Sequence, residues 1–160
     1  MIRQAAAAAA LAFAVNGSPG LSAVGTIPFP GVQRRMDGAT DAVALTFDDG
    51  PHPQGTPAML EALDRLGMRA TFYLVGRDVR RHPQVARELA AAGHELGLHG
   101  DRHLPHLAMP PSWVMGDLER GLAAIEDATG VRPRSLRAPF GAAAVGTLAF
   151  ARRQDMRVVG

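Results

Sequence analysis

The chain has 160 residues, of which 47% are hydrophobic and 20% charged, and its formal net charge is +2. These values are ordinary for a globular domain with a real core, so disorder over most of the chain is not expected. The sequence contains no cysteine, which excludes disulfides, thiolate nucleophiles and cysteine-ligated zinc. Any metal must therefore be held by histidine and carboxylate side chains.

All 17 basic residues are arginines. They are scattered and alternate with acidic residues, and they do not form a stripe beside exposed aromatic side chains. A nucleic-acid surface needs such a stripe or patch. The sequence therefore predicts no nucleic-acid partner.

The N-terminus, residues 1–15, carries Arg3 and then an apolar, alanine-rich run. This pattern is typical of an export signal and too short for a membrane span, although an alanine helix packed on the domain is the alternative. Glycine and proline in residues 16–40 indicate a linker, and the ordered domain is predicted at 41–160. If residues 1–15 are an export signal, we expect a secreted or cell-envelope protein, and otherwise a cytoplasmic one. Membrane contact is expected only if residues 1–15 are an uncleaved anchor.

Short apolar runs and helical periodicity alternate through the rest of the chain. Strands are predicted at 43–47, 70–75, 94–98, 135–137 and 157–159, and helices at 58–66, 83–92, 112–128 and 142–153. Thr56 is the expected N-cap of the first helix. This alternation implies parallel strands joined by right-handed crossovers. No Gly-x-Gly-x-x-Gly follows the first strand, so a barrel-like α/β fold, with its chemistry at the carboxyl ends of the strands, is favoured over a dinucleotide fold.

Two adjacent carboxylates, Asp48 and Asp49, follow the first predicted strand. They repel each other unless a positive charge lies beside them. We expect the Gly50-Pro51 turn to let both lean into one pocket, where one can bind a metal and the other act as a general base. The alternative is an ordinary surface turn.

His99 and His103 follow the third predicted strand and are four residues apart, so both rings can face the same side. Two histidines and one carboxylate are a common ligand set for a catalytic divalent metal. The same edge of the sheet is expected to carry Asp49 and Arg137. These residues together favour a metal site.

Three motifs, Thr46–Pro51, Gly93–His103 and Arg137–Gly141, resemble in order and spacing those of the polysaccharide deacetylase family, the NodB-homology domain of carbohydrate esterase family 4. The resemblance covers roughly residues 41–160. It implies an α/β fold, a distorted (β/α) barrel, here incomplete with about five strands present. It also implies a hydrolase that removes N-acetyl groups from N-acetylglucosamine polymers of the chitooligosaccharide or peptidoglycan type.

The resemblance also implies roles for single residues. Asp48 would be the catalytic base and Arg137 would hold it ionised and oriented. The metal, most simply Zn²⁺, would be bound by Asp49, His99 and His103, and substrate by Pro139 and Phe140. An O-acetyl xylan esterase of the same family, or a catalytically impaired fragment that binds metal or glycan, are the alternatives, and the oligomeric state is not predicted.

The sequence departs from the family pattern in its catalytic acid. The family takes this acid from a histidine in a Leu-x-His motif that comes late in the domain, and the sequence ends at Gly160 before that motif would appear, so we expect a chain whose C-terminal part is missing. His52 and His106 are interpreted as solvated loop residues and not as substitutes. Val158 and Val159 are expected to form an unpaired apolar edge.

Smaller features yield further expectations. Gly100 stands where the family has Ser or Thr, which should loosen the loop unless Asp101 and Arg102 form a compensating ion pair. Trp113, the only tryptophan, is either a sugar-stacking platform or a packing residue, and packing is expected. Glu95 is expected to be a structural hydrogen-bond acceptor.

Overall fold

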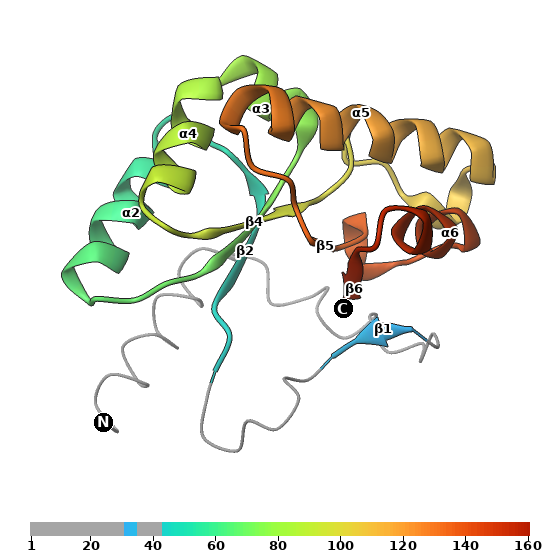
Figure 1. The fold of residues 1–160 in the computed structure, drawn as a ribbon, viewed down its shortest axis with the longest axis horizontal. Coiled ribbons are helices and arrows are strands. Elements are labelled where there is room, and N and C mark those ends of the chain that lie inside the picture. The colour runs from blue at the N-terminus through green and yellow to red at the C-terminus, as the bar shows by residue number, and fades with distance from the viewer. Residues whose placement is uncertain (1–30, 35–42) are drawn as a thin grey trace.

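A computed structural model describes residues 31–34 and 43–160 of the chain (Figure 1). In these residues, six parallel strands form one sheet in the order β1-β6-β5-β4-β3-β2. The strands are β1 (Val32–Gln33), β2 (Thr46–Gly50), β3 (Thr71–Leu74), β4 (Glu95–Leu98), β5 (Ser135–Leu136) and β6 (Arg157–Val159). The predicted parallel α/β architecture is confirmed, and the sheet is open between β1 and β2. The segment 1–15 and most of 16–40 lie outside the described residues.

Helices connect the strands and arch over one side of the sheet (Figure 1). They are α2 (Gly55–Arg65), α3 (Gly76–Arg81), α4 (Pro83–Ala91), α5 (Pro111–Thr129) and α6 (Val145–Arg153), with short 3-10 turns η1 (His106–Ala108) and η2 (Pro139–Gly141). The four predicted helices are present with shifted ends, and α3 was not predicted. Thr56 is not the cap of α2: it is buried inside the helix, and its hydroxyl accepts the His52 N–H at 2.9 Å.

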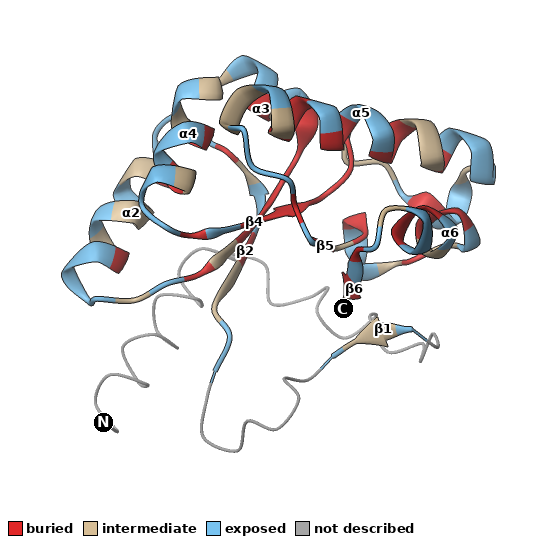
Figure 2. Cartoon of the chain, viewed as in Figure 1, coloured by how far each residue is buried: buried red, intermediate tan, exposed pale blue. Residues whose placement is uncertain are grey.

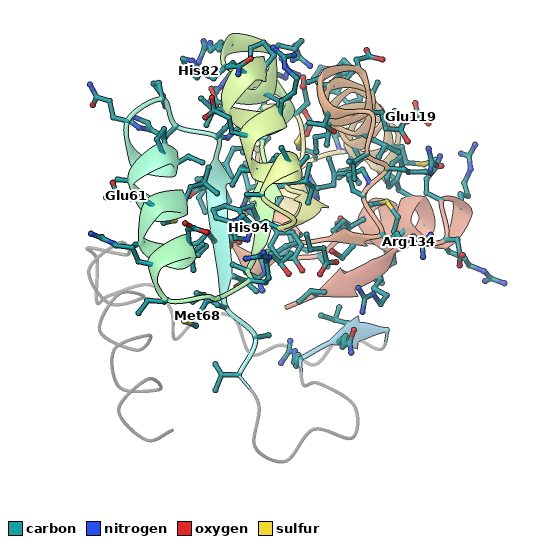
Figure 3. All side chains as sticks on the ribbon, turned by 60° about the vertical axis from the view of Figure 1, so that its left-hand side comes forward. Glu61, Met68, His82, His94, Glu119 and Arg134 are labelled. Carbon is teal, nitrogen blue, oxygen red and sulfur yellow. The ribbon has the colours of Figure 1, made fainter. Side chains whose placement is uncertain are left out.

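The sheet has one apolar and one polar face, because alternate side chains of a strand point to opposite sides. The apolar face packs under the helices (Figure 2), and each large side chain buried there contributes about 1.5–3 kcal/mol. Its strand residues are Phe47, Phe72, Leu74, Leu96, Leu98, Leu136 and Val158, and they meet Leu63, Leu89, Leu118, Ile125 and Phe150 of the helices. The outer sides of α2 and α5 carry exposed residues such as Glu61 and Glu119 (Figure 3).

On the polar face, Glu95 of β4 contacts side chains from three other strands. Its carboxylate accepts hydrogen bonds from Thr71 at 2.9 Å and from Ser135 at 3.1 Å, and Arg157 lies 3.2 Å away. The expectation that Glu95 is a structural acceptor is confirmed.

The last strand is not an open edge. β6 pairs with β5 on one side and with β1 on the other, where Val158 lies opposite Val32, and Val158 is buried. The expectation of an unpaired edge at Val158 and Val159 is therefore wrong, because β1 covers it. None of the helices in residues 31–34 and 43–160 combines the length and the apolar character that crossing a membrane requires.

Candidate metal centre

Asp48 and Asp49 lie inside β2 and do not follow it. Asp49 has a positive φ of 66°, and the pairing of β2 with β3 shifts register between Phe47 and Gly50. Aspartate is one of the few residues other than glycine that adopts this left-handed conformation readily. The irregular strand at Asp49, and not the expected Gly50-Pro51 turn, therefore interrupts the alternation and gives the two carboxylates their separate partners.

Asp49 meets both predicted histidines. Its Oδ1 lies 3.0 Å from His103 Nε2 and 3.4 Å from His99 Nε2. The three atoms that would face a metal lie within 4.8 Å of one another. The structure thus brings the predicted ligand set together at the carboxyl ends of β2 and β4.

His99 is held in one orientation by the backbone of Arg137, directly after β5. Its ring is buried and Nδ1 lies 2.7 Å from the backbone carbonyl of Arg137. A carbonyl only accepts hydrogen bonds, so Nδ1 carries the proton and donates it. This leaves Nε2 directed at Asp49, the arrangement that orients a histidine ligand for a metal.

The charges of the group suit a divalent cation. The pKa of Asp49 is lowered, chiefly by its close contact with His99, against the opposing effect of burial. The pKa of His103 is also lowered, mainly because burial disfavours the imidazolium. Near neutral pH the carboxylate is ionised and the His103 ring neutral, which are the forms that bind metal. The donor set therefore fits a divalent ion held by two imidazoles and one carboxylate.

Asp48 lies beside the metal group and is held by Arg137. The Arg137 Nη1 donates to Asp48 Oδ1 at 2.8 Å and to the Thr46 hydroxyl at 2.9 Å. Its guanidinium carbon lies 4.4 Å from the centre of the buried Tyr73 ring, a cation–π contact. Gly97 makes room for that ring, because a Cβ at Gly97 would lie 2.4 Å from it. Arg137 thus has a fixed position, and so does the carboxylate it contacts.

The two predicted substrate-binding residues differ in exposure. Phe140 is 65% exposed, and its ring centre lies 4.6 Å from that of His103. Pro139 is buried and packs close to Gly100, so only the Phe140 ring is open to a ligand.

The two histidines interpreted as solvated differ from each other. His52 is exposed, and its Nδ1 accepts the N–H groups of Gln54 and Gly55 at the start of α2. His106 is fully buried, with Nδ1 3.0 Å from the Thr147 hydroxyl, and burial lowers its pKa to about 4. The expectation of a solvated His106 is wrong, because η1 places it between α5 and α6.

The loop that carries the two histidines, residues 99–103, is fixed by a buried carboxylate that sequence reasoning missed. Asp117 on α5 is 0% exposed and accepts the Asp101 N–H at 2.8 Å. Gly100 has a φ of +77°, and a Cβ there would lie 2.9 Å from Asp117 Oδ2. Glycine at 100 thus fits the packing and does not loosen the loop. The signal in the sequence was an acid at position 117, within the buried stripe of Val114, Leu118 and Leu122.

Asp101 does not form the compensating ion pair with Arg102. It is buried and accepts from Arg80 at 2.6 Å, with Arg120 at 3.5 Å. Arg102 instead lies 3.8 Å from Asp117. The loop is thereby tied to α3, which precedes it in the chain, and to α5, which follows it.

The family model for polysaccharide deacetylase matches residues 35–159. The chain belongs to the polysaccharide deacetylase family. This confirms the family that the three motifs indicated, and the parallel α/β fold agrees with solved structures of carbohydrate esterase family 4.

Relatives in the polysaccharide deacetylase family have been named for two kinds of substrate. A chitooligosaccharide deacetylase of Bradyrhizobium sp. is 36% identical over 118 residues, which are 72% of this chain and 54% of that protein. A peptidoglycan-N-acetylglucosamine deacetylase of Listeria monocytogenes is 34% identical over 100 residues, 62% of this chain and 22% of that protein. The chain thus spans about half the length of the first relative and less of the second.

Among solved structures of the family, a family 4 carbohydrate esterase of Streptomyces lividans, in complex with acetate, superposes with a TM-score of 0.71 at 28% identity. The match covers 74% of this chain and 61% of that one.

Proposed function

We propose that the chain is a metal-dependent hydrolase that removes N-acetyl groups from a polysaccharide containing N-acetylglucosamine, of the chitooligosaccharide or peptidoglycan type. The observation that carries the proposal is the position of Asp49, His99 and His103 beside the Asp48–Arg137 pair. The names of the relatives support the substrate class. A polymer of the cell wall as substrate supports a secreted or cell-envelope location.

Hydrolysis of an acetamide needs an attacking water and a base that takes its proton. Asp48 is the base, since it is the carboxylate that does not face the histidines, and Arg137 fixes the direction of its oxygens. The water oxygen bonds to the acetyl carbon as one water proton passes to Asp48. The carbon–nitrogen bond then breaks while the nitrogen takes up a proton from solvent, and acetate and a free amine form.

Asp49, His99 and His103 would hold a divalent ion, for which we propose Zn²⁺ because imidazole and carboxylate are ligands that zinc accepts. Such an ion supplies Lewis-acid polarisation of the carbonyl and lowers the pKa of a bound water to about 7 in favourable sites. The chain's own contribution is to keep both imidazoles oriented. Phe140 forms an exposed apolar wall next to His103, where an acetyl methyl group or sugar ring can lie.

Two substitutions separate these roles. Asp49→Ala should abolish stoichiometric zinc binding and acetate release, whereas Asp48→Asn should retain zinc and lose acetate release from N-acetylglucosamine oligomers. Zinc is measured by calorimetry and elemental analysis, acetate by an enzymatic assay, and folding by circular dichroism. Full zinc binding by Asp49→Ala would refute the ligand assignment, and an active Asp48→Asn would refute the base.

The substrate assignment has its own test. Acetate release from acetylated xylan but not from chitin oligomers would replace the proposal with an O-acetyl esterase. Zinc binding without acetate release from either polymer would replace it with a metal or glycan-binding role.

A further inference from the structure

The only tryptophan of the chain is not a packing residue. Trp113, in the first turn of α5, is 63% exposed, while its neighbour Val114 is fully buried. The expectation that Trp113 packs into the core is therefore wrong. The buried stripe of α5 begins one residue later, which turns the indole toward solvent.

Trp113 borders a cavity of about 420 Å³. Arg102, Ser112, Gly116 and Arg120 line the rest of it. Residues 113, 116 and 120 are spaced three and four apart, so they lie on one face of α5. Gly116 leaves open the space beside the indole, because a Cβ there would meet only the end of the Arg120 side chain, at 3.3 Å.

The cavity and the candidate metal centre share the loop 99–103, which contributes Arg102 to the cavity. Arg102 immediately precedes His103, and it reaches Asp117 on α5 at 3.8 Å. In a parallel α/β fold, the helix after a strand starts near that strand's carboxyl end. The first turn of α5 therefore lies at the same edge of the sheet as the metal ligands.

The cavity has the chemistry of a sugar site. An indole presents a broad apolar face to the carbon–hydrogen face of a pyranose ring, and arginine N–H groups donate to hydroxyl and acetamide oxygens. The guanidinium groups of both lining arginines also face buried carboxylates. Arg102 lies near Asp117, and Arg120 lies near both Asp101 and Asp117. Their charges are thereby compensated and their positions limited, which suits an uncharged ligand.

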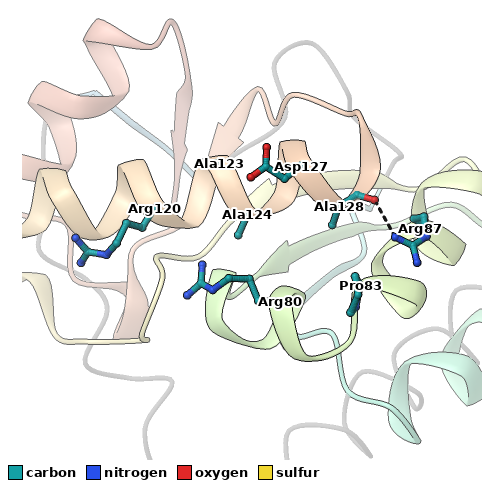
Figure 4. Close-up of a pocket in the computed structure, with 8 residues that line it drawn as sticks. All are labelled: Arg80, Pro83, Arg87, Arg120, Ala123, Ala124, Asp127 and Ala128. Atoms are coloured by element: carbon teal, nitrogen blue, oxygen red, sulfur yellow. Dashed lines mark hydrogen bonds between the residues drawn. The ribbon is translucent and has the colours of Figure 1, made fainter.

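A second cavity, of about 400 Å³ between α4 and α5, lacks such a surface (Figure 4). It is lined by arginines, Asp127 and small apolar residues, without an aromatic ring, and Arg87 there donates to the Ala128 carbonyl at 3.4 Å. The comparison favours the Trp113 cavity as the carbohydrate site.

We propose that the Trp113 cavity is a glycan subsite that binds an uncharged pyranose of the polymer, at a distance from the sugar whose acetyl group is removed. The proposal rests on the proposed function for its ligand class. It makes the affinity for substrate depend on the length of the oligomer, since only a chain that reaches both places gains from both.

The test uses the fluorescence of Trp113, which reports on this cavity alone because the chain has no other tryptophan. N-acetylglucosamine tetramer and hexamer are titrated into the parent chain and into Asp49→Ala. A saturable change of emission in both is the expected result, because the subsite does not need the metal. Emission that stays constant in the parent up to millimolar oligomer would overturn the subsite.

A second variant fills the cavity without removing the reporter. Gly116→Leu places a side chain beside the indole and should weaken hexamer binding by about tenfold or more, while Arg152→Gln, at an exposed position on α6, should leave it unchanged. Equal affinity of Gly116→Leu and the parent would refute the proposal. Acetate release with an unresponsive tryptophan would refute the subsite alone, and a saturable response without acetate release would support the subsite while refuting the proposed function.

Discussion

Arg137 contributes to the site through two different parts of the residue. Its backbone carbonyl orients His99, while its side chain contacts Asp48, Thr46 and Tyr73. A substitution of the side chain leaves the carbonyl in place. The two contributions can therefore be separated by experiment.

Arg137→Lys should lower kcat/KM for N-acetylglucosamine oligomers by about 100-fold, because a single flexible ammonium does not fix the Asp48 carboxylate as a planar guanidinium does. Zinc affinity should stay within a few-fold of the parent, since the carbonyl that orients His99 remains. Kinetics and zinc calorimetry on the same preparation check both. A parallel loss of zinc binding would show that the side chain acts through the metal group instead.

The buried His106 should make stability fall in mild acid. Its pKa in the folded chain is about 4, against 6.5 for an ordinary histidine. Above pH 6.5 the ring is neutral in both states. Between pH 6.5 and 4 only the unfolded chain binds the proton, so unfolding becomes easier as pH falls, by about 3 kcal/mol in total.

The check is urea unfolding of the parent and of His106→Leu across this pH range. Between pH 7 and pH 4, the free energy of unfolding should fall by about 3 kcal/mol less in the variant than in the parent, because the titrating group is gone. Identical slopes for both proteins would contradict the assignment. The comparison cancels the contribution of His94, whose pKa is also lowered by burial.

At the scale of single residues, the sequence predicted which residues form the site better than it predicted how buried individual side chains are. Asp48, Asp49, His99, His103 and Arg137 were predicted from strand ends and motif spacing, and the structure brings them together. The burial of His106 and the exposure of Trp113 were not predicted. Both depend on how α5 and α6 are rotated about their axes, which a local pattern does not determine.

Three glycines allow the elements around the site to approach closely. A Cβ on Gly76 would lie 2.6 Å from Gly121 Cα, and one on Gly121 would lie 2.6 Å from the Gly100 carbonyl oxygen. The start of α3, the histidine loop and the middle of α5 therefore meet backbone to backbone. This contact also explains why α3 was not predicted: a glycine directly after the strand predicted at 70–75 is typical of a strand end, whereas here Gly76 starts a helix and allows its close packing.

Gly121→Ala should separate α5 from the histidine loop. Overpacking costs about 1–3 kcal/mol, and the better helix propensity of alanine returns about 1 kcal/mol, so we expect a net destabilisation of up to about 2 kcal/mol and weaker zinc binding. Gly116→Ala is the matched control, in the same helix but facing only a flexible arginine end at 3.3 Å. It should stabilise the chain by up to about 1 kcal/mol. Denaturant unfolding distinguishes them, and equal effects of the two would contradict the role of the glycine contact.

At the scale of the whole molecule, the alternation of strands and helices predicted the parallel sheet. It did not predict the number of strands in that sheet. β1 has two residues, and its partner β6 lies at the other end of the chain, with Val32 opposite Val158. A segment that short carries no periodicity of its own. Its pairing arises from the completed sheet, which is why the last strand was expected to be an open edge.

Zinc should stabilise the fold as a whole, since its three proposed ligands come from β2 and from the loop 99–103, which unfolding separates. At a free zinc concentration of 100 times Kd, linkage adds about 2.7 kcal/mol to the free energy of unfolding. For a chain of this size that corresponds to a rise in Tm of roughly 5–10 °C. Calorimetric scans with and without zinc measure the shift, and Asp49→Ala should abolish it. A shift that survives in Asp49→Ala would place the stabilising ion elsewhere.

The position of Arg137 at the end of β5 has a mechanical consequence. The imidazole of His99 and the carboxylate of Asp48 are both attached to this one residue, through its carbonyl and its guanidinium. A displacement of this residue therefore reaches both groups at once, so the orientation of the proposed metal ligand and that of the proposed base are mechanically coupled.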